Sequence, residues 1–152
     1  MMASRSFSAP RGLLLAAAAF GLSQGVHAAS VEIAGNVSLS VNAANAAGGH
    51  LATDTDHITY DVSNAAGTKK LLGRLNQDMP VGTTLAAQLA SPPGATAQGS
   101  VTLTASDQTL VTGIGVGSYG GLDLAFTLTA TVQAARVTAA TRTFILTIVD
   151  AP

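Results

Sequence analysis

The stretch that decides the fold is Leu122-Asp123-Leu124-Ala125-Phe126-Thr127-Leu128-Thr129-Ala130-Thr131-Val132. Apolar side chains occupy every even-numbered position, and Asp, Ala or Thr occupies the positions between them. In a β-strand successive side chains point to opposite faces of the sheet, so this period of two predicts a strand with one buried face. We therefore expect the stretch to be a principal strand of an all-β domain.

The same alternation recurs elsewhere along the chain, and Gly, Pro and Asn punctuate the segments between, as they do in turns. A series of about seven or eight short strands is typical of one immunoglobulin-like β-sandwich, which is the fold we expect. The expected strands are residues 31–41, 58–62, 71–75, 85–89, 101–103, 110–114, 122–132 and 144–148. Residues 42–49, 94–100, 113–121 and 133–140 are expected to be loops. The expected core contains Tyr60, Leu124, Phe126, Leu128, Phe144, Leu146 and Ile148.

The start of the chain has the parts of a secretory signal peptide. Arg5 and Arg11 precede the apolar run Gly12-Leu13-Leu14-Leu15-Ala16-Ala17-Ala18-Ala19-Phe20-Gly21-Leu22, and Val26-His27-Ala28 places small residues before a cleavage site. The run is shorter than the roughly 20 helical residues that span a bilayer. We expect a signal peptide at 1–28, a β-sandwich domain at 29–152, and export to the periplasm, the cell surface or the extracellular space, without membrane insertion after cleavage.

Composition narrows the function of the mature domain. The chain has no cysteine, so this exported domain is expected to fold without disulfides. After residue 28 there are five Lys and Arg against eight Asp and Glu, a net charge of 5 − 8 = −3 with neutral histidine. Nucleic-acid binding requires a clustered basic surface, which this balance disfavours. Carbohydrate modules usually present aromatic platforms, and only four aromatic residues remain after residue 28: Tyr60, Tyr119, Phe126 and Phe144.

The densest polar cluster is Asp54-Thr55-Asp56-His57. Calcium requires about six to eight oxygen ligands, and this segment lacks the glycine and the terminal glutamate of a calcium loop. His50 and His57 do not have a recognised zinc spacing, and cysteine is absent. We therefore expect a solvated turn before a strand, with no metal ligand and no cofactor.

No catalytic motif is evident. The chain has no G-x-S-x-G nucleophile elbow, and 113–117, Gly-Ile-Gly-Val-Gly, neither ends in Lys-Ser/Thr nor opens a helix. Most Ser and Thr residues alternate with apolar residues, where β-propensity accounts for them. We expect no catalytic residue and no enzyme activity.

Two terminal runs carry a family resemblance. The predicted mature chain begins Ala29-Ser30-Val31-Glu32-Ile33-Ala34-Gly35-Asn36-Val37-Ser38-Leu39-Ser40-Val41, and near its end stands Arg142-Thr143-Phe144-Ile145-Leu146-Thr147-Ile148-Val149. Together with the Thr/Ala/Gly-rich strands between them, these runs resemble exported bacterial fimbrial subunits, the pilins of the chaperone–usher type. The chain departs from many such pilins in having no cysteine and in ending Val149-Asp150-Ala151-Pro152.

The resemblance implies an incomplete sandwich, completed by a strand from the next subunit. We therefore expect a non-catalytic exported structural or adhesive surface protein, a fibre subunit that assembles by β-strand donation through residues 29–41. The residues expected to insert are Val31, Ile33, Val37, Leu39 and Val41. The expected partner is another copy or another exported protein, with a periplasmic chaperone as a further partner. The alternative is a monomeric secreted β-sandwich that binds a glycan or a protein ligand.

Overall fold

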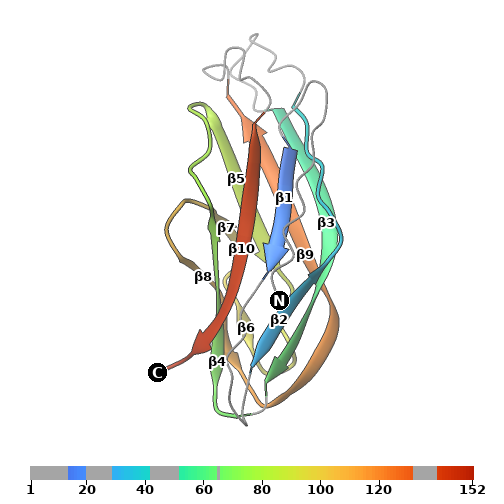
Figure 1. Cartoon of the computed structure of the whole chain (residues 1–152), viewed down its shortest axis with the longest axis vertical. Helices are drawn as coiled ribbons and strands as arrows, with labels where there is room; N and C mark the ends of the chain where they lie inside the picture. The colour runs from blue at the N-terminus through green and yellow to red at the C-terminus, as the bar shows by residue number, and fades with distance from the viewer. Residues whose placement is uncertain (1–13, 20–28, 42–51, 65, 132–139) are drawn as a thin grey trace.

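The chain is a sandwich of two β-sheets (Figure 1). A computed structural model describes residues 14–19, 29–41, 52–64, 66–131 and 140–152, which form ten strands and no helix. The expected all-β sandwich is confirmed. The loops expected at 42–49 and 133–140 lie outside the described residues, apart from Ala140.

Each sheet has five strands. Sheet A has the order β1 (Leu14–Ala19), β10 (Thr141–Asp150), β4 (Lys69–Leu75), β8 (Gln108–Ile114), β6 (Thr96–Ala97). Sheet B has the order β2 (Ser30–Ala34), β3 (Ala52–Asn64), β9 (Gly117–Ala130), β5 (Thr83–Leu89), β7 (Ser100–Thr102). All pairings are antiparallel except that of β1 with β10, which is parallel.

The core lies between the sheets and contains the expected residues. Tyr60, Phe126 and Phe144 are fully buried with Leu124, Leu128 and Leu146, and Ile148 packs partly buried against them. From Leu122 to Ala130 the even-numbered residues of β9 point inward, as the alternation predicted. Gly73 of β4 makes room for this packing, because a Cβ there would lie 2.4 Å from Leu110 Cδ1 and 2.9 Å from Phe144 Cε2.

The loop expected at residues 113–121 is wrong for most of its length. β8 continues to Ile114 and β9 already begins at Gly117, so only two residues connect the sheets there. The glycine-containing part of β9 forms a bulge, where the register of β9 with β3 shifts opposite Asp61. Gly121 has φ +66° at this bulge and donates its N–H to Asp61 Oδ1 at 2.6 Å. A positive φ suits glycine, so the residues that suggested a loop allow the strand to bend.

Candidate functional site

The predicted assembly strand, residues 29–41, lies along one edge of sheet B. β2 pairs antiparallel with β3, and the chain beyond Gly35 continues outside the regular strand. Three of the five predicted donor side chains, Val31, Val37 and Leu39, are buried in the core of their own chain, at 3%, 2% and 1% exposure. Ile33 and Val41 pack partly buried against the same core. Donation of this run to another subunit stays a prediction, and it would require the run to leave β3.

Residues 36–41 are attached to β3 by two carboxylates. The N–H of Ser38 donates to Asp56 Oδ2 at 3.0 Å, and the N–H of Ser40 donates to Asp54 Oδ2 at 2.7 Å. Carboxylates are strong acceptors for backbone N–H groups. They replace the carbonyl acceptors of a regular ladder here, so side chains contribute to the attachment of this part of the assembly strand.

The solvated turn expected at 54–57 is therefore wrong. These residues lie inside β3, paired with β9 from Ala52↔Ala130 onward. Asp54 and Asp56 lie on the same face of β3 as the buried Ile58 and Tyr60. Both aspartates are only partly exposed, because the assembly strand covers them. Hydrophobic alternation does not reveal the first part of this strand, because two of its inward-facing positions hold carboxylates and not apolar side chains.

His57 points to the outer face of sheet B and meets Asp123 of β9. Its Nδ1 lies 3.1 Å from Asp123 Oδ2, and the two side chains are 59% and 56% exposed. An exposed pair of this kind contributes about 0–1 kcal/mol to stability. Among the described residues, no group of three or more His, Cys, Asp or Glu side chains could hold a metal ion. His50 lies outside the described residues.

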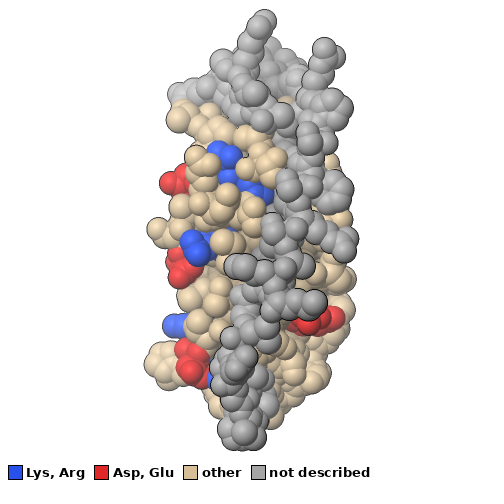
Figure 2. All heavy atoms as spheres, in the orientation of Figure 1, with Lys and Arg blue, Asp and Glu red and all other residues tan. Residues whose placement is uncertain are grey.

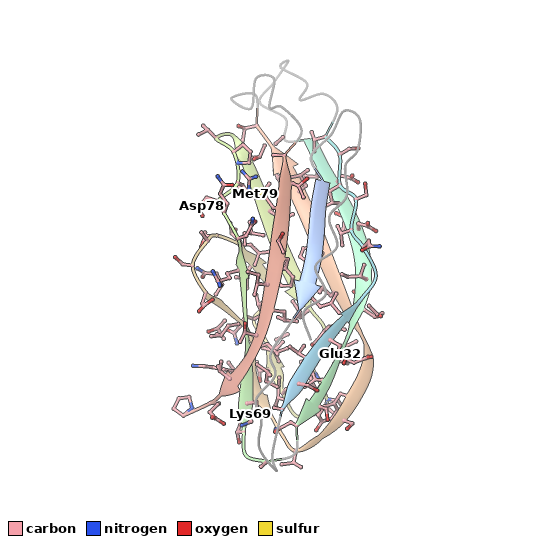
Figure 3. All side chains as sticks on the ribbon, viewed as in Figure 1. Glu32, Lys69, Asp78 and Met79 are labelled. Carbon is pink, nitrogen blue, oxygen red and sulfur yellow. The ribbon has the colours of Figure 1, made fainter. Side chains whose placement is uncertain are left out.

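The positive charges in the described part of the chain lie on one sheet. All its Lys and Arg residues are on β4 and β10 of sheet A, which also carries Asp150, whereas sheet B carries Glu32 and four Asp residues. In Figure 2 the blue atoms lie on the left half of the face, where Figure 1 draws β4 and β8. Figure 3 labels Glu32 beside β2 and Lys69 at the start of β4.

β10 would become a second sheet edge if β1 were absent. The N–H and C=O of Thr143 bond to Asn76, and the N–H of Ala151 bonds to Thr68 O, so odd-numbered residues direct their backbone groups toward β4. Because these directions alternate along a strand, the backbone groups of Phe144 and Leu146 point the opposite way. That side is the one on which β1 pairs with residues 141–146. β1 also lies near β2, so both edges are on one side of the sandwich.

The edge of β10 lacks the usual devices that prevent pairing with another strand. Residues 144–149, Phe-Ile-Leu-Thr-Ile-Val, contain no charge, Pro or Gly, and no register shift interrupts the pairing with β4. The two charged side chains of β10 interact on the β4 side: Arg142 Nε donates to Asp78 O at 2.8 Å, and Asp150 pairs with Lys69. Exposed edges normally carry charge, Pro or a bulge. This edge was missed from sequence, although its unbroken run of β-formers was a usable signal.

β1 lies within the predicted signal peptide. Leu14–Ala19 forms a strand in this structure, and the remainder of 1–28 lies outside the described residues. Cleavage after Ala28 stays a prediction. No helix in the part of the chain that the structure describes is long and apolar enough to cross a membrane. Comparisons with protein-family models, with curated proteins and with solved structures found no match to this chain.

Proposed function

We propose that this protein is a non-catalytic, exported structural or adhesive surface subunit that joins to other subunits by β-strand addition. The observation that carries the proposal is the outer edge of β10, where residues 144–149 are an uncharged run of β-formers and where, among the described residues, the only paired strand lies within the predicted signal peptide. Removal of 1–28 would leave the backbone groups of Phe144 and Leu146 without their strand partner.

An edge of this kind is suited to accept an extended segment. Main-chain hydrogen bonds to a sheet edge give affinity that depends little on sequence, and alternate side chains set the register. Residues 144–149 also have the composition of segments that pair readily with other chains. A mature subunit therefore gains stability when an extended strand covers this edge.

The donor that we propose is the run 29–41 of a neighbouring copy. β2 is an edge strand of only five residues, and carboxylates hold the segment that follows it. Its departure would expose Val31, Val37 and Leu39, at a cost of about 1.5–3 kcal/mol for each fully exposed side chain. Exchange is favourable only where the acceptor buries these side chains again. Such head-to-tail exchange builds a fibre when the subunits do not close into a ring.

The proposal is tested with a charge placed beside the accepting edge. Ile145 lies half-buried on the outer face of β10, where Ile145→Lys puts a cation next to any added strand. Thr109→Lys on β8 is the matched control, because it adds the same charge to the same sheet two strands farther in. Sedimentation velocity of the exported protein over a concentration series measures self-association.

We expect the wild type and Thr109→Lys to form oligomers and Ile145→Lys to remain monomeric, with unchanged circular dichroism in all three. Equal association of the two lysine variants would show that the edge of β10 is not the acceptor. A wild type that stays monomeric at the highest concentration would overturn the proposal. That result would favour the monomeric binding module.

A further inference from the structure

We propose that residues 14–19 act as an intramolecular cap, which occupies the strand-accepting edge of β10 until the predicted leader is removed. The role given to that edge rests on the proposed function, but the cap itself rests on the pairing of β1 with β10 within one chain. In Figure 1 β1 lies alongside β10, and Leu14 to Ala19 are in parallel register with Thr141 to Leu146.

The cap covers the part of the edge that most needs a partner. It spans Phe144 and Leu146, whose side chains are fully buried and whose backbone groups point away from β4. An extended strand is the only regular structure that can satisfy both the N–H and the C=O groups along such an edge. While β1 is in place, an incoming strand cannot pair with residues 141–146.

The composition of the cap makes it replaceable. β1 is Leu-Leu-Ala-Ala-Ala-Ala, and alanine is a weak strand former. The run 29–41 offers the β-branched residues Val31, Ile33, Val37 and Val41, which form better cross-strand contacts. β1 holds the edge chiefly because it is covalently attached, which gives it an effective concentration on the order of millimolar.

Cleavage removes that advantage. Hydrolysis of the Ala28–Ala29 peptide bond by a signal peptidase consumes one water, leaving a carboxylate on Ala28 and an amino group on Ala29. The released leader must then compete for the edge at its bulk concentration, far below the effective concentration in the intact chain. Processing therefore converts a capped subunit into one whose edge accepts a strand.

The first test traps the cap in the intact chain of 152 residues. The chain has no cysteine, so Ala18→Cys with Ile145→Cys introduces a single pair at positions that are register partners. The matched control is Ala17→Cys with Ile145→Cys, in which the first residue lies on the opposite face of β1 and one register position away. Oxidised glutathione is the oxidant, and mass spectrometry of proteolytic fragments detects the intrachain disulfide.

We expect the in-register pair to oxidise at least about tenfold faster than the control, since only its Cβ atoms can approach disulfide distance. Equal rates, or no disulfide in either variant, would show that residues 14–19 do not hold this register. Neither outcome depends on whether subunits assemble.

The second test releases the cap without cleavage. The double variant Ala16→Pro with Ala17→Pro removes both backbone N–H groups, one of which points toward β10 because backbone directions alternate along a strand. The double variant Ala16→Thr with Ala17→Thr is the control, since it keeps both N–H groups. Hydrogen exchange is measured at the amides of Phe144 and Leu146. The amides of Ile145 and Thr147 face β4 and report whether the sheet stays folded.

We expect the prolines to accelerate exchange of Phe144 and Leu146 by at least about tenfold while Ile145 and Thr147 stay protected. Unchanged exchange at all four amides would overturn the cap. If Phe144 and Leu146 are released but the proline variant stays monomeric, the cap stands and the proposed function fails. If the prolines unfold sheet A, so that Ile145 also exchanges fast, the cysteine test decides.

Discussion

Phe126 and Phe144 meet edge to face at the centre of the sandwich, with ring centroids 5.0 Å apart and ring planes at 79°. Phe126 comes from β9 of sheet B and Phe144 from β10 of sheet A, so this contact joins the two sheets. Edge-to-face packing of aromatic rings adds about 0.5–1.5 kcal/mol to the effect of burial alone. The contact also places the core directly behind the proposed accepting edge.

Replacement of Phe126 by Ala is expected to lower the free energy of unfolding by about 3–5 kcal/mol, because it removes a fully buried ring and leaves a cavity beside Phe144. Urea titration followed by circular dichroism measures the change. Phe126→Leu is the control and should cost less, since it fills more of the same space. A loss below about 1 kcal/mol for the alanine variant would contradict the packing described for this ring.

Tyr60 is expected to make the fold sensitive to alkali. Its hydroxyl donates to Ala90 O, and burial raises its pKa well above the ordinary value of 10.0. Above pH 10 the unfolded chain releases this proton while the native chain retains it, so the free energy of unfolding falls as pH rises, by at most about 1.4 kcal/mol per pH unit. The contribution is fully present below pH 10.

Urea titrations between pH 8 and pH 11 on Tyr60→Phe and Tyr119→Phe check this expectation. Tyr60→Phe should be less stable by about 0.5–1.5 kcal/mol at pH 8, because it loses the bond to Ala90, and its stability should fall less steeply above pH 10. Tyr119→Phe should keep the steep fall. Parallel pH profiles for the two variants would show that Tyr60 is not the responsible group.

Hydrophobic alternation predicted the faces of the strands well and their boundaries less well. Leu124, Phe126 and Leu128 point inward as expected, because alternation follows directly from strand geometry. Alternation does not predict the start of β3, because Asp54 and Asp56 occupy inward-facing positions. Their partly buried carboxylates accept hydrogen bonds from the N–H groups of Ser40 and Ser38. Those partners are distant in sequence, so no local pattern contains them.

The site was harder to predict than the fold for the same reason. The sequence indicated an alternating run at 29–41, but an edge is a property of strand order, and strand order depends on long-range pairings. The composition of the apolar segment that contains β1 indicates a leader, but it does not show whether the segment also pairs with a strand near the other end of the chain.

The two carboxylates of β3 are expected to control how tightly residues 36–41 are attached. Asp54→Ala with Asp56→Ala removes both acceptors, so the amides of Ser38 and Ser40 should exchange at least about tenfold faster. Asp54→Asn with Asp56→Asn keeps a carbonyl acceptor at each position and should be intermediate. Nuclear magnetic resonance follows the exchange, and unchanged rates in the alanine variant would contradict the proposed attachment.

A disulfide that holds β2 on β3 is expected to prevent assembly. Ala34 and Thr59 are register partners on the exposed face of sheet B, so Ala34→Cys with Thr59→Cys forms a bridge from the run 29–41 to β3 without entering the core. If this run is the donor, the oxidised exported protein should be monomeric in sedimentation velocity, and reduction with dithiothreitol should restore oligomers. The reduced form is its own control, since it has the same two substitutions and the same core. Oligomers of equal size before and after reduction would show that the run stays in its own sheet during assembly, which would leave the edge of β10 to accept a strand from elsewhere.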